Sequence, residues 1–210
     1  MGKKLKPSSK RWVAEHAADH YVQEAKRLGY RSRAVFKLKE LNERDRLLKP
    51  GITVVDLGAA PGGWSQLARP LLGPKGKLIA LDILPMDPVP QVDVILGDFR
   101  EEAVLRALES KLQGSRSVDL VMSDMAPNIT GIDTADQVAS IQLAELALEF
   151  ARTQLKASGA FVTKLFQGEG FEVFVKEVRK CFETVHLRKP KASRPRSREI
   201  YLVARNFRVV

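Results

Sequence analysis

The chain has 210 residues, and its 35 Lys and Arg against 25 Asp and Glu give a formal net charge of +10. A single cysteine, Cys181, excludes a disulfide framework and a zinc site built from several cysteines, and we expect no metal site. No run of about 20 apolar residues is present, so no transmembrane helix is expected. The basic start lacks the apolar stretch of a secretory signal. These features predict a soluble cytoplasmic protein, by default a monomer, with one main domain.

The positive charge is concentrated at the two ends of the sequence. Residues 1–50 carry a net charge of +8 and residues 188–208 carry +7, whereas residues 51–187 carry −5. Such asymmetry favours a polyanion partner, with RNA or DNA first, over a merely solvated surface. The candidates for phosphate contact are Arg11, Arg31, Arg33, Arg194, Arg196 and Arg198.

The hydrophobic pattern changes near residue 50. Residues 12–28 and 32–48 read as helices, with Ser32 as a possible N-cap, and Pro50-Gly51 ends the second of them. After them, strands alternate with helices. The expected strands are 52–57, 77–82, 92–98, 118–124, 159–166, 184–189 and 199–206. The expected helices are 64–72, 101–112, 136–156 and 171–182.

This alternation predicts an α/β fold with an open, mostly parallel sheet. The last two strands have no helix between them, so we expect them to form an antiparallel pair at the end of the sheet. Residues 1–50 would then be a basic helical extension that binds RNA and belongs to the same unit. Residues 51–210 would be the catalytic or binding domain.

Acidic residues end several of the expected strands. Asp56 leads into a loop that contains Gly58, Gly62 and Gly63, and this spacing is not the dinucleotide pattern G-x-G-x-x-G. A nucleoside cofactor without a pyrophosphate needs only backbone contact and an acid for its ribose. Asp82 is placed for the ribose hydroxyls and Asp98 for an adenine amine. Each acid alone is more often a helix N-cap, but the whole series favours a nucleoside site.

Six longer segments of the sequence are distinctive: DLGAAPGGWSQ, LDILPMDP, GDFR, MSDMAPN, KLFQGEGF and RPRSREIYLVA. They resemble the FtsJ/RrmJ family of S-adenosylmethionine-dependent ribose 2′-O-methyltransferases, and the similarity is to members that act on bacterial large-subunit rRNA. The resemblance covers nearly the whole chain and implies a Rossmann-like methyltransferase fold. The cofactor contacts that it implies are Gly62, Trp64, Asp82, Asp98 and Asp124.

The same resemblance implies a catalytic tetrad of Lys37, Asp124, Lys164 and Glu199. It also implies the substrate, a uridine in the A-loop of 23S rRNA on the assembled 50S subunit. Methyl transfer to a ribose hydroxyl needs alignment and removal of a proton. A lysine can act as a base where burial and a neighbouring positive charge favour its neutral form. We therefore hypothesise that Lys164 is the general base, assisted by Lys37, with the two acids orienting the lysines.

Two other functions stay open from the sequence. The chain could methylate the ribose of tRNA or of another RNA. It could also be a ribosome assembly factor that binds rRNA and needs no turnover, although the complete tetrad argues against this. A nicotinamide dehydrogenase is disfavoured by the glycine spacing.

Overall fold

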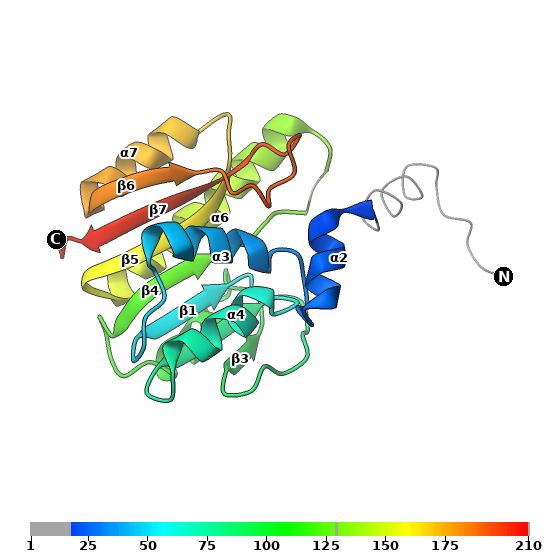
Figure 1. The fold of residues 1–210 in the computed structure, drawn as a ribbon. Coiled ribbons are helices and arrows are strands. Elements are labelled where there is room, and N and C mark those ends of the chain that lie inside the picture. The colour runs from blue at the N-terminus through cyan, green and yellow to red at the C-terminus, as the bar shows by residue number, and fades with distance from the viewer. Residues whose placement is uncertain (1–17, 129, 210) are drawn as a thin grey trace.

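The computed structural model describes residues 18–128 and 130–209, so the predicted helix over residues 12–28 lies partly outside this range. Seven strands form one sheet in the order β3-β2-β1-β4-β5-β7-β6 (Figure 1). The strands are β1 (Thr53–Leu57), β2 (Lys77–Asp82), β3 (Asp93–Leu96), β4 (Val118–Ser123), β5 (Leu155–Phe166), β6 (Phe182–Arg188) and β7 (Glu199–Phe207).

The mostly parallel sheet and its antiparallel final strand are confirmed. β7 runs antiparallel to both of its neighbours, β5 and β6, and all other pairs are parallel. The last strand does not lie at the edge, because β7 inserts between β5 and β6. The apolar run of β7 explains this order, since a central strand is covered on both faces, whereas β6 is only partly buried.

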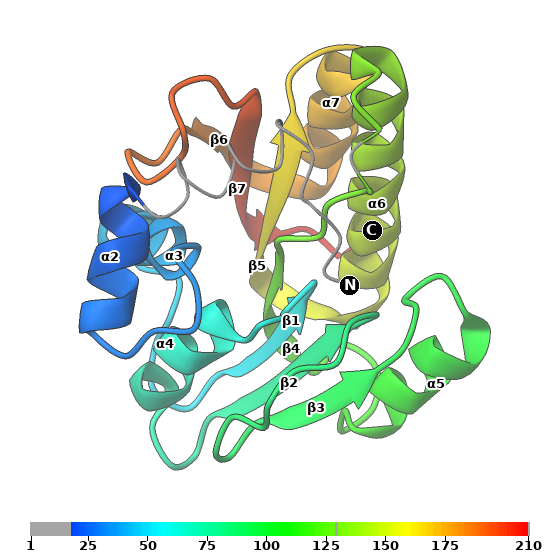
Figure 2. The same ribbon diagram turned by 90° about the vertical axis from the view of Figure 1, so that its right-hand side faces the viewer.

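Helices cover both faces of the sheet (Figures 1 and 2). They are α2 (His20–Arg27), α3 (Val35–Asp45), α4 (Gly63–Leu72), α5 (Glu102–Ser110), α6 (Asp133–Gln154) and α7 (Phe171–Cys181). Alternate strand residues divide the core in two. Val54 and Val162 pack with α3 and α4, whereas Val55 and Phe161 pack with α5, α6 and α7. Successive strand side chains point to opposite faces, so one buried strand serves both cores.

Two predicted helix starts are wrong. The helix expected to begin at Asp136 begins at Asp133, and the Asp136 carboxylate accepts hydrogen bonds from the preceding loop at Thr130 and Gly131. The helix expected after Ser32 begins at Val35, with Ala34 at the N-cap position and no side-chain cap. The Asp136 carboxylate thus serves the preceding loop, whereas the Ser32 hydroxyl is buried and has no hydrogen-bond partner among the described residues.

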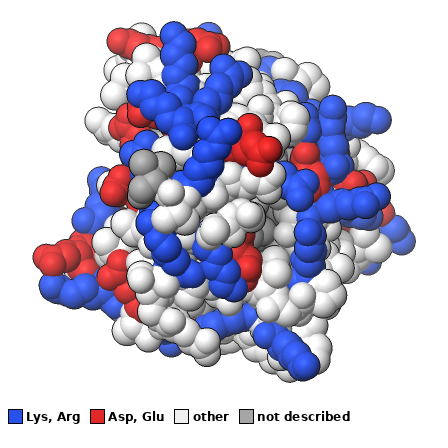
Figure 3. Space-filling view, turned by 90° about the vertical axis from the view of Figure 1, so that its left-hand side faces the viewer, with Lys and Arg blue, Asp and Glu red and all other residues white. Residues whose placement is uncertain are grey.

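The two ends of the sheet differ in chemistry. The first five strands run in one direction, so their carboxyl ends meet at what we call the carboxyl end, which faces the viewer in Figure 2. The opposite side, the amino end, faces the viewer in Figure 3. Ligands of open α/β sheets bind outside the carboxyl ends of the strands. No helix among the described residues is long and apolar enough to cross a membrane.

Candidate active site

A cavity of about 1020 Å³ opens at the carboxyl end of β1, β2, β3 and β4. One residue at or just after the end of each strand lines the cavity: Gly58, Asp82, Asp98 and Asp124. Leu84, Phe99 and Met125 add apolar surface. An apolar cavity with a few convergent polar groups is typical of a small-molecule site. Within residues 18–128 and 130–209, no group of three or more His, Cys, Asp or Glu side chains is placed to hold a metal ion.

The shape of the cavity depends on a close approach between two loops. Gly58 has a φ of 77°, and a Cβ atom there would lie 2.7 Å from the backbone nitrogen of Met125. A contact this short is not tolerated, so any side chain at position 58 would push the first loop away from the loop after β4. The glycine therefore brings the backbone of both loops to the ligand, as a nucleoside site requires.

Asp82 and Asp98 both line the cavity, as the sequence predicts for two cofactor-binding acids. The two oxygens of Asp82 accept hydrogen bonds from the backbone N–H groups of Ala60 and Leu84, each at 2.8 Å. Asp98 accepts from the Arg100 guanidinium at 2.6 Å, and this hydrogen bond lowers the pKa of Asp98 below its ordinary value. A carboxylate oxygen has more than one acceptor site, so both acids can hold a ligand while the loop fixes them.

Gly62 lies in the loop after β1 and Trp64 lies in α4. Neither residue lines the cavity. The indole Nε1 of Trp64 donates to the Ala34 carbonyl oxygen at 2.9 Å, and its ring lies 5.8 Å from that of Tyr201. Trp64 therefore packs α4 against α3 and β7. The contact of Gly62 and Trp64 with a cofactor stays a prediction.

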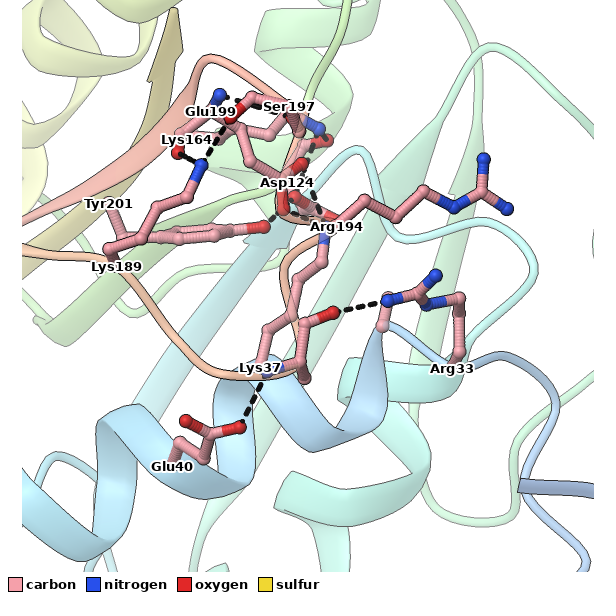
Figure 4. Close-up of polar contacts among 12 residues, drawn as sticks. Arg33, Lys37, Glu40, Asp124, Lys164, Lys189, Arg194, Ser197, Glu199 and Tyr201 are labelled. Atoms are coloured by element: carbon pink, nitrogen blue, oxygen red, sulfur yellow. Dashed lines mark hydrogen bonds and ion pairs between the residues drawn. The ribbon is translucent and has the colours of Figure 1, made fainter. Parts of the chain in front are cut away.

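The four residues of the predicted tetrad meet beside the cavity as two ion pairs (Figure 4). Lys164 Nζ lies 2.9 Å from Asp124 Oδ1 and also donates to the Asp124 carbonyl oxygen at 2.6 Å. Lys37 Nζ lies 2.8 Å from Glu199 Oε1. Lys164 and Glu199 are buried, with 8% and 9% of their surface exposed. Asp124 belongs to both the tetrad and the cavity wall, so it joins the two.

Strand pairing explains why residues so distant in sequence meet. In the antiparallel pair of β5 and β7, Lys164 stands opposite Tyr201, and Glu199 stands two residues before Tyr201. Residues two apart on a strand share a face, so Lys164, Glu199 and Tyr201 point to the side that α3 covers. Lys37 extends from α3 toward that face.

The two carboxylates stay charged despite their burial. Burial by itself would raise the pKa of Asp124, but the charges of Lys164 and Lys37 and a hydrogen bond from Tyr201 outweigh it and hold the pKa below its ordinary value. The pKa of Glu199 is also lowered, because Lys37 outweighs the effect of burial. The site therefore pairs two carboxylates with two amines at neutral pH.

Tyr201 is a site residue that the sequence reasoning missed. Its hydroxyl donates to Asp124 Oδ1 at 2.7 Å, and Lys37 Nζ lies 5.7 Å from the centre of its ring. Burial and the charges of Asp124 and Glu199 raise the pKa of Tyr201 well above its ordinary value, so the hydroxyl stays a donor. Its position two residues after Glu199 in an apolar strand was the available signal.

Asp56 lies buried at the end of β1 and is not exposed to solvent. Ser65 Oγ donates to its Oδ2 at 2.7 Å, while its Oδ1 has no hydrogen-bond partner in the described chain. Burial is the main cause that raises the pKa of Asp56 to about 7, and the charges of Asp124 and Asp82 add to it. Asp56 thus differs from the other strand-end acids in being half protonated near neutral pH.

The predicted phosphate-binding arginines serve the fold as well. Arg31 donates to the carbonyl oxygens of Pro61 and Pro88 at 3.2 and 2.7 Å, so it fixes the loop after β1 and the loop after β2. Arg33 pairs with Asp19 and donates to the Ala192 carbonyl oxygen. The remaining predicted positions are Arg194 (3.6 Å from Asp19), Arg198 (2.9 Å from Asp133), Arg196 (exposed) and Arg11, which lies outside the described residues.

These contacts bring the segment before β7 to the helices near the N-terminal end of the described chain. Glu40 of α3 accepts hydrogen bonds from the backbone N–H groups of Lys191 and Ala192. The segment between β6 and β7 therefore lies along α3, beside Lys37 and Glu199 (Figure 4). Binding of RNA by the six arginines stays a prediction.

Comparisons with known proteins agree with this geometry. Residues 30–207 match the model of the FtsJ-like methyltransferase family. A curated relative from Azoarcus sp. (strain BH72), named ribosomal RNA large subunit methyltransferase E, is 58% identical over 98% of this chain and 100% of its own length. The crystal structure of a protein from Plasmodium falciparum, assigned as a ribosomal RNA methyltransferase, superposes with a TM-score of 0.76.

That structure is 31% identical and covers 85% of this chain and 98% of its own. A protein from Clostridium thermocellum, assigned as an rRNA methylase, has a TM-score of 0.52 at 19% identity over 80% of this chain and 95% of its own, and it shows the fold alone. The family model spans the cavity, α3 and the whole tetrad. The chain therefore belongs to the FtsJ-like methyltransferase family.

Proposed function

We propose that the protein uses S-adenosylmethionine to methylate the ribose 2′-hydroxyl of a uridine in large-subunit (23S) rRNA, in the A-loop of the assembled 50S subunit. The observation that carries the proposal is the position of the Lys164–Asp124 pair: Asp124 lines the cavity, and Lys164 Nζ lies 2.9 Å from its Oδ1. A reacting hydroxyl that lies beside Asp124 would therefore also lie beside the amine of Lys164. The name of the Azoarcus relative supports rRNA of the large subunit as the substrate class.

The residues of the cavity fit the cofactor. Asp82 would hold the ribose hydroxyls, Asp98 would accept from the adenine amine, and Leu84 and Phe99 would cover the apolar faces. Gly58 keeps the space open, because any side chain there would meet Met125. When bound, S-adenosylmethionine supplies a methyl group on a positively charged sulfur, which is a good leaving group.

In the proposed mechanism, the tetrad positions the hydroxyl and removes its proton. Lys164, after giving its own extra proton to solvent, would accept the proton of the 2′-hydroxyl at Nζ as the 2′-oxygen takes the methyl group, whose bond to the cofactor sulfur would break. Lys37, held by Glu199, stabilises the negative charge that develops on the oxygen. Asp124 fixes Lys164 through two contacts, at 2.9 and 2.6 Å, and so limits the directions in which its nitrogen can point.

The test is methylation of large subunits from cells that lack the modification. The subunits would be incubated with S-adenosylmethionine labelled in the methyl group, and the label mapped on the RNA. Lys164→Ala should lower the rate about 10²- to 10⁴-fold, as expected for loss of a general base. Lys176→Ala, at an exposed position of α7, is the matched control and should leave the rate unchanged.

The same labelling assay with tRNA, together with calorimetric titration of S-adenosylmethionine, separates the other outcomes. Labelling of tRNA in place of large subunits would identify another RNA as the substrate. Cofactor binding with no labelling of any RNA would favour an assembly factor that needs no turnover. Full activity of Lys164→Ala would remove the proposed base.

A further inference from the structure

The amino end of the sheet collects basic residues from all along the chain. Six segments connect or end the elements there: 44–52, 73–77, 111–117, 152–158, 179–183 and 205–209. With Asp93 and Asp119, at the starts of β3 and β4, this end of the sheet holds 13 Lys or Arg and 4 Asp or Glu, which leaves 22 basic and 21 acidic residues for the rest of the sequence. The net charge of the protein is therefore concentrated at this end.

Figure 3 looks onto this face and shows Lys and Arg side chains spread over much of it, with fewer acidic ones between them. The concentration is not visible in the sequence, because four of the segments begin and end within residues 51–187, whose overall charge is negative. The fold creates the basic face by placing the strand starts side by side. This face is at the amino end of the sheet, whereas Asp82, Asp98 and Asp124 of the cavity wall lie at the carboxyl ends of β2, β3 and β4.

A notch on this face has the character of an anion site. It has a volume of about 230 Å³, and three of the residues that line it are basic: Arg46, Lys49 and Arg205. Arg46 and Lys49 are exposed, and their side chains form no hydrogen bond or ion pair within the described part of the chain. Arg205 donates only to a backbone carbonyl oxygen, that of Asp45, at 3.0 Å, so its charge is not neutralised by a carboxylate.

The single acid of the notch, Asp119, is already occupied. Its Oδ2 accepts from Lys156 Nζ and from the backbone N–H of Thr53, both at 2.8 Å. The positive charge of the three basic residues therefore faces solvent without compensation. Such a surface attracts anions and releases bound counterions when it meets a polyanion.

Helix ends explain only part of this arrangement. Basic residues in the last turn of a helix stabilise it through the helix dipole, but Lys49 lies in a loop and Arg205 in β7. Arg46 has a φ of 48°, the left-handed conformation in which a helix usually ends with glycine. An arginine there costs backbone strain, which a binding role would justify.

We propose that this amino-end basic face is a second RNA-binding surface, with Arg46, Lys49 and Arg205 holding phosphates of an RNA duplex. A large folded RNA could then be held at two opposite sides of the protein. Phosphate backbone fits better than an acidic protein, because the charges are spread over a broad face and no large apolar side chain of the notch is exposed. Stable protein interfaces carry an apolar centre.

The test uses binding of a short RNA duplex, measured by fluorescence anisotropy over a series of salt concentrations. The variant Arg46→Gly/Lys49→Ser removes two charges and replaces a strained residue with the one that the backbone favours. The free energy of unfolding of this variant, measured in urea, should equal or exceed that of the unmodified protein. The matched control, Arg106→Ser/Lys176→Ser, removes two exposed charges from α5 and α7, outside this face.

Each lost phosphate contact reduces the steepness of the plot of log K against log salt concentration by about 0.9. The slope for the double variant should therefore be less steep by about 1.8. If the two proteins bind equally at about 1 M salt, the variant should bind the duplex about 60-fold more weakly than the unmodified protein at about 0.1 M salt. The control should bind as the unmodified protein does. Equal loss in both variants, or loss in neither, would overturn the proposal.

Binding to isolated large subunits distinguishes the kind of partner. The variant should lose affinity for the subunits in parallel with the duplex. Normal duplex binding together with lost subunit binding would overturn the proposal and indicate a protein partner. Cofactor affinity, measured by calorimetry, should be unchanged, so failure of this proposal is separable from failure of the proposed methylation.

Discussion

Substitution of Asp56 by asparagine should make the protein more stable at alkaline pH and change the dependence of stability on pH. Asp56 is fully buried, and only Ser65 compensates its charge by a hydrogen bond. Its pKa is raised from 3.8 to about 7 in the folded state, mainly by burial. Between these values the folded protein keeps a proton that the unfolded chain releases, so stability falls as the pH rises.

The size of the effect follows from the shift. About three pKa units at 1.36 kcal/mol each correspond to about 4 kcal/mol, absent below about pH 4 and complete above about pH 7. Asparagine has the same shape and does not titrate. The free energy of unfolding of Asp56→Asn relative to the unmodified protein should therefore increase by up to about 4 kcal/mol across this range.

Urea denaturation followed by tryptophan fluorescence at several pH values measures this difference. Other titrating groups affect both proteins alike, so the comparison isolates Asp56. Ser65→Ala is a second check: it removes the hydrogen bond that lowers the pKa of Asp56, so the fall in stability should extend to higher pH. A difference between Asp56→Asn and the unmodified protein that stays constant with pH would refute the reasoning.

Two further predictions concern residues around the tetrad and the cavity. Tyr201→Phe removes the 2.7 Å hydrogen bond to Asp124 and should lower the free energy of unfolding at pH 7 by about 2 kcal/mol, measured in urea. Because the pKa of Asp124 is lowered in the folded state, this loss should shrink as the pH falls below about 4, and a loss that persists in acid would contradict the assignment. Arg31→Ala removes the contacts that fix the loop after β1 and should weaken S-adenosylmethionine binding about tenfold in calorimetry, equal to about 1.4 kcal/mol. Arg27→Ala, which breaks only an exposed pair with Glu24, is its control, and equal effects of the two would argue against a role of Arg31 in the loop.

Local pattern was sufficient to predict most of the secondary structure and the type of sheet. The β-branched runs, the glycine loop after Asp56 and the missing helix before the last strand each act within a few residues, so they can be recognised in the sequence. Helix starts were less accurate: Ser32 caps no helix, because its hydroxyl has no hydrogen-bond partner among the described residues, and the Asp136 carboxylate binds the loop before it from inside the helix. The order of the last strands depends on burial, which local pattern does not show.

The sequence by itself indicated which residues form the candidate site, and the tertiary structure decided how they are arranged. The tetrad was predicted from the resemblance to the FtsJ/RrmJ family, and the cavity acids from their places at strand ends. Their pairing as Lys164–Asp124 and Lys37–Glu199, and the contact with Tyr201, depend on the register of β5 and β7. The basic amino end likewise exists only after folding, because strand starts separated by tens of residues become neighbours in a parallel sheet.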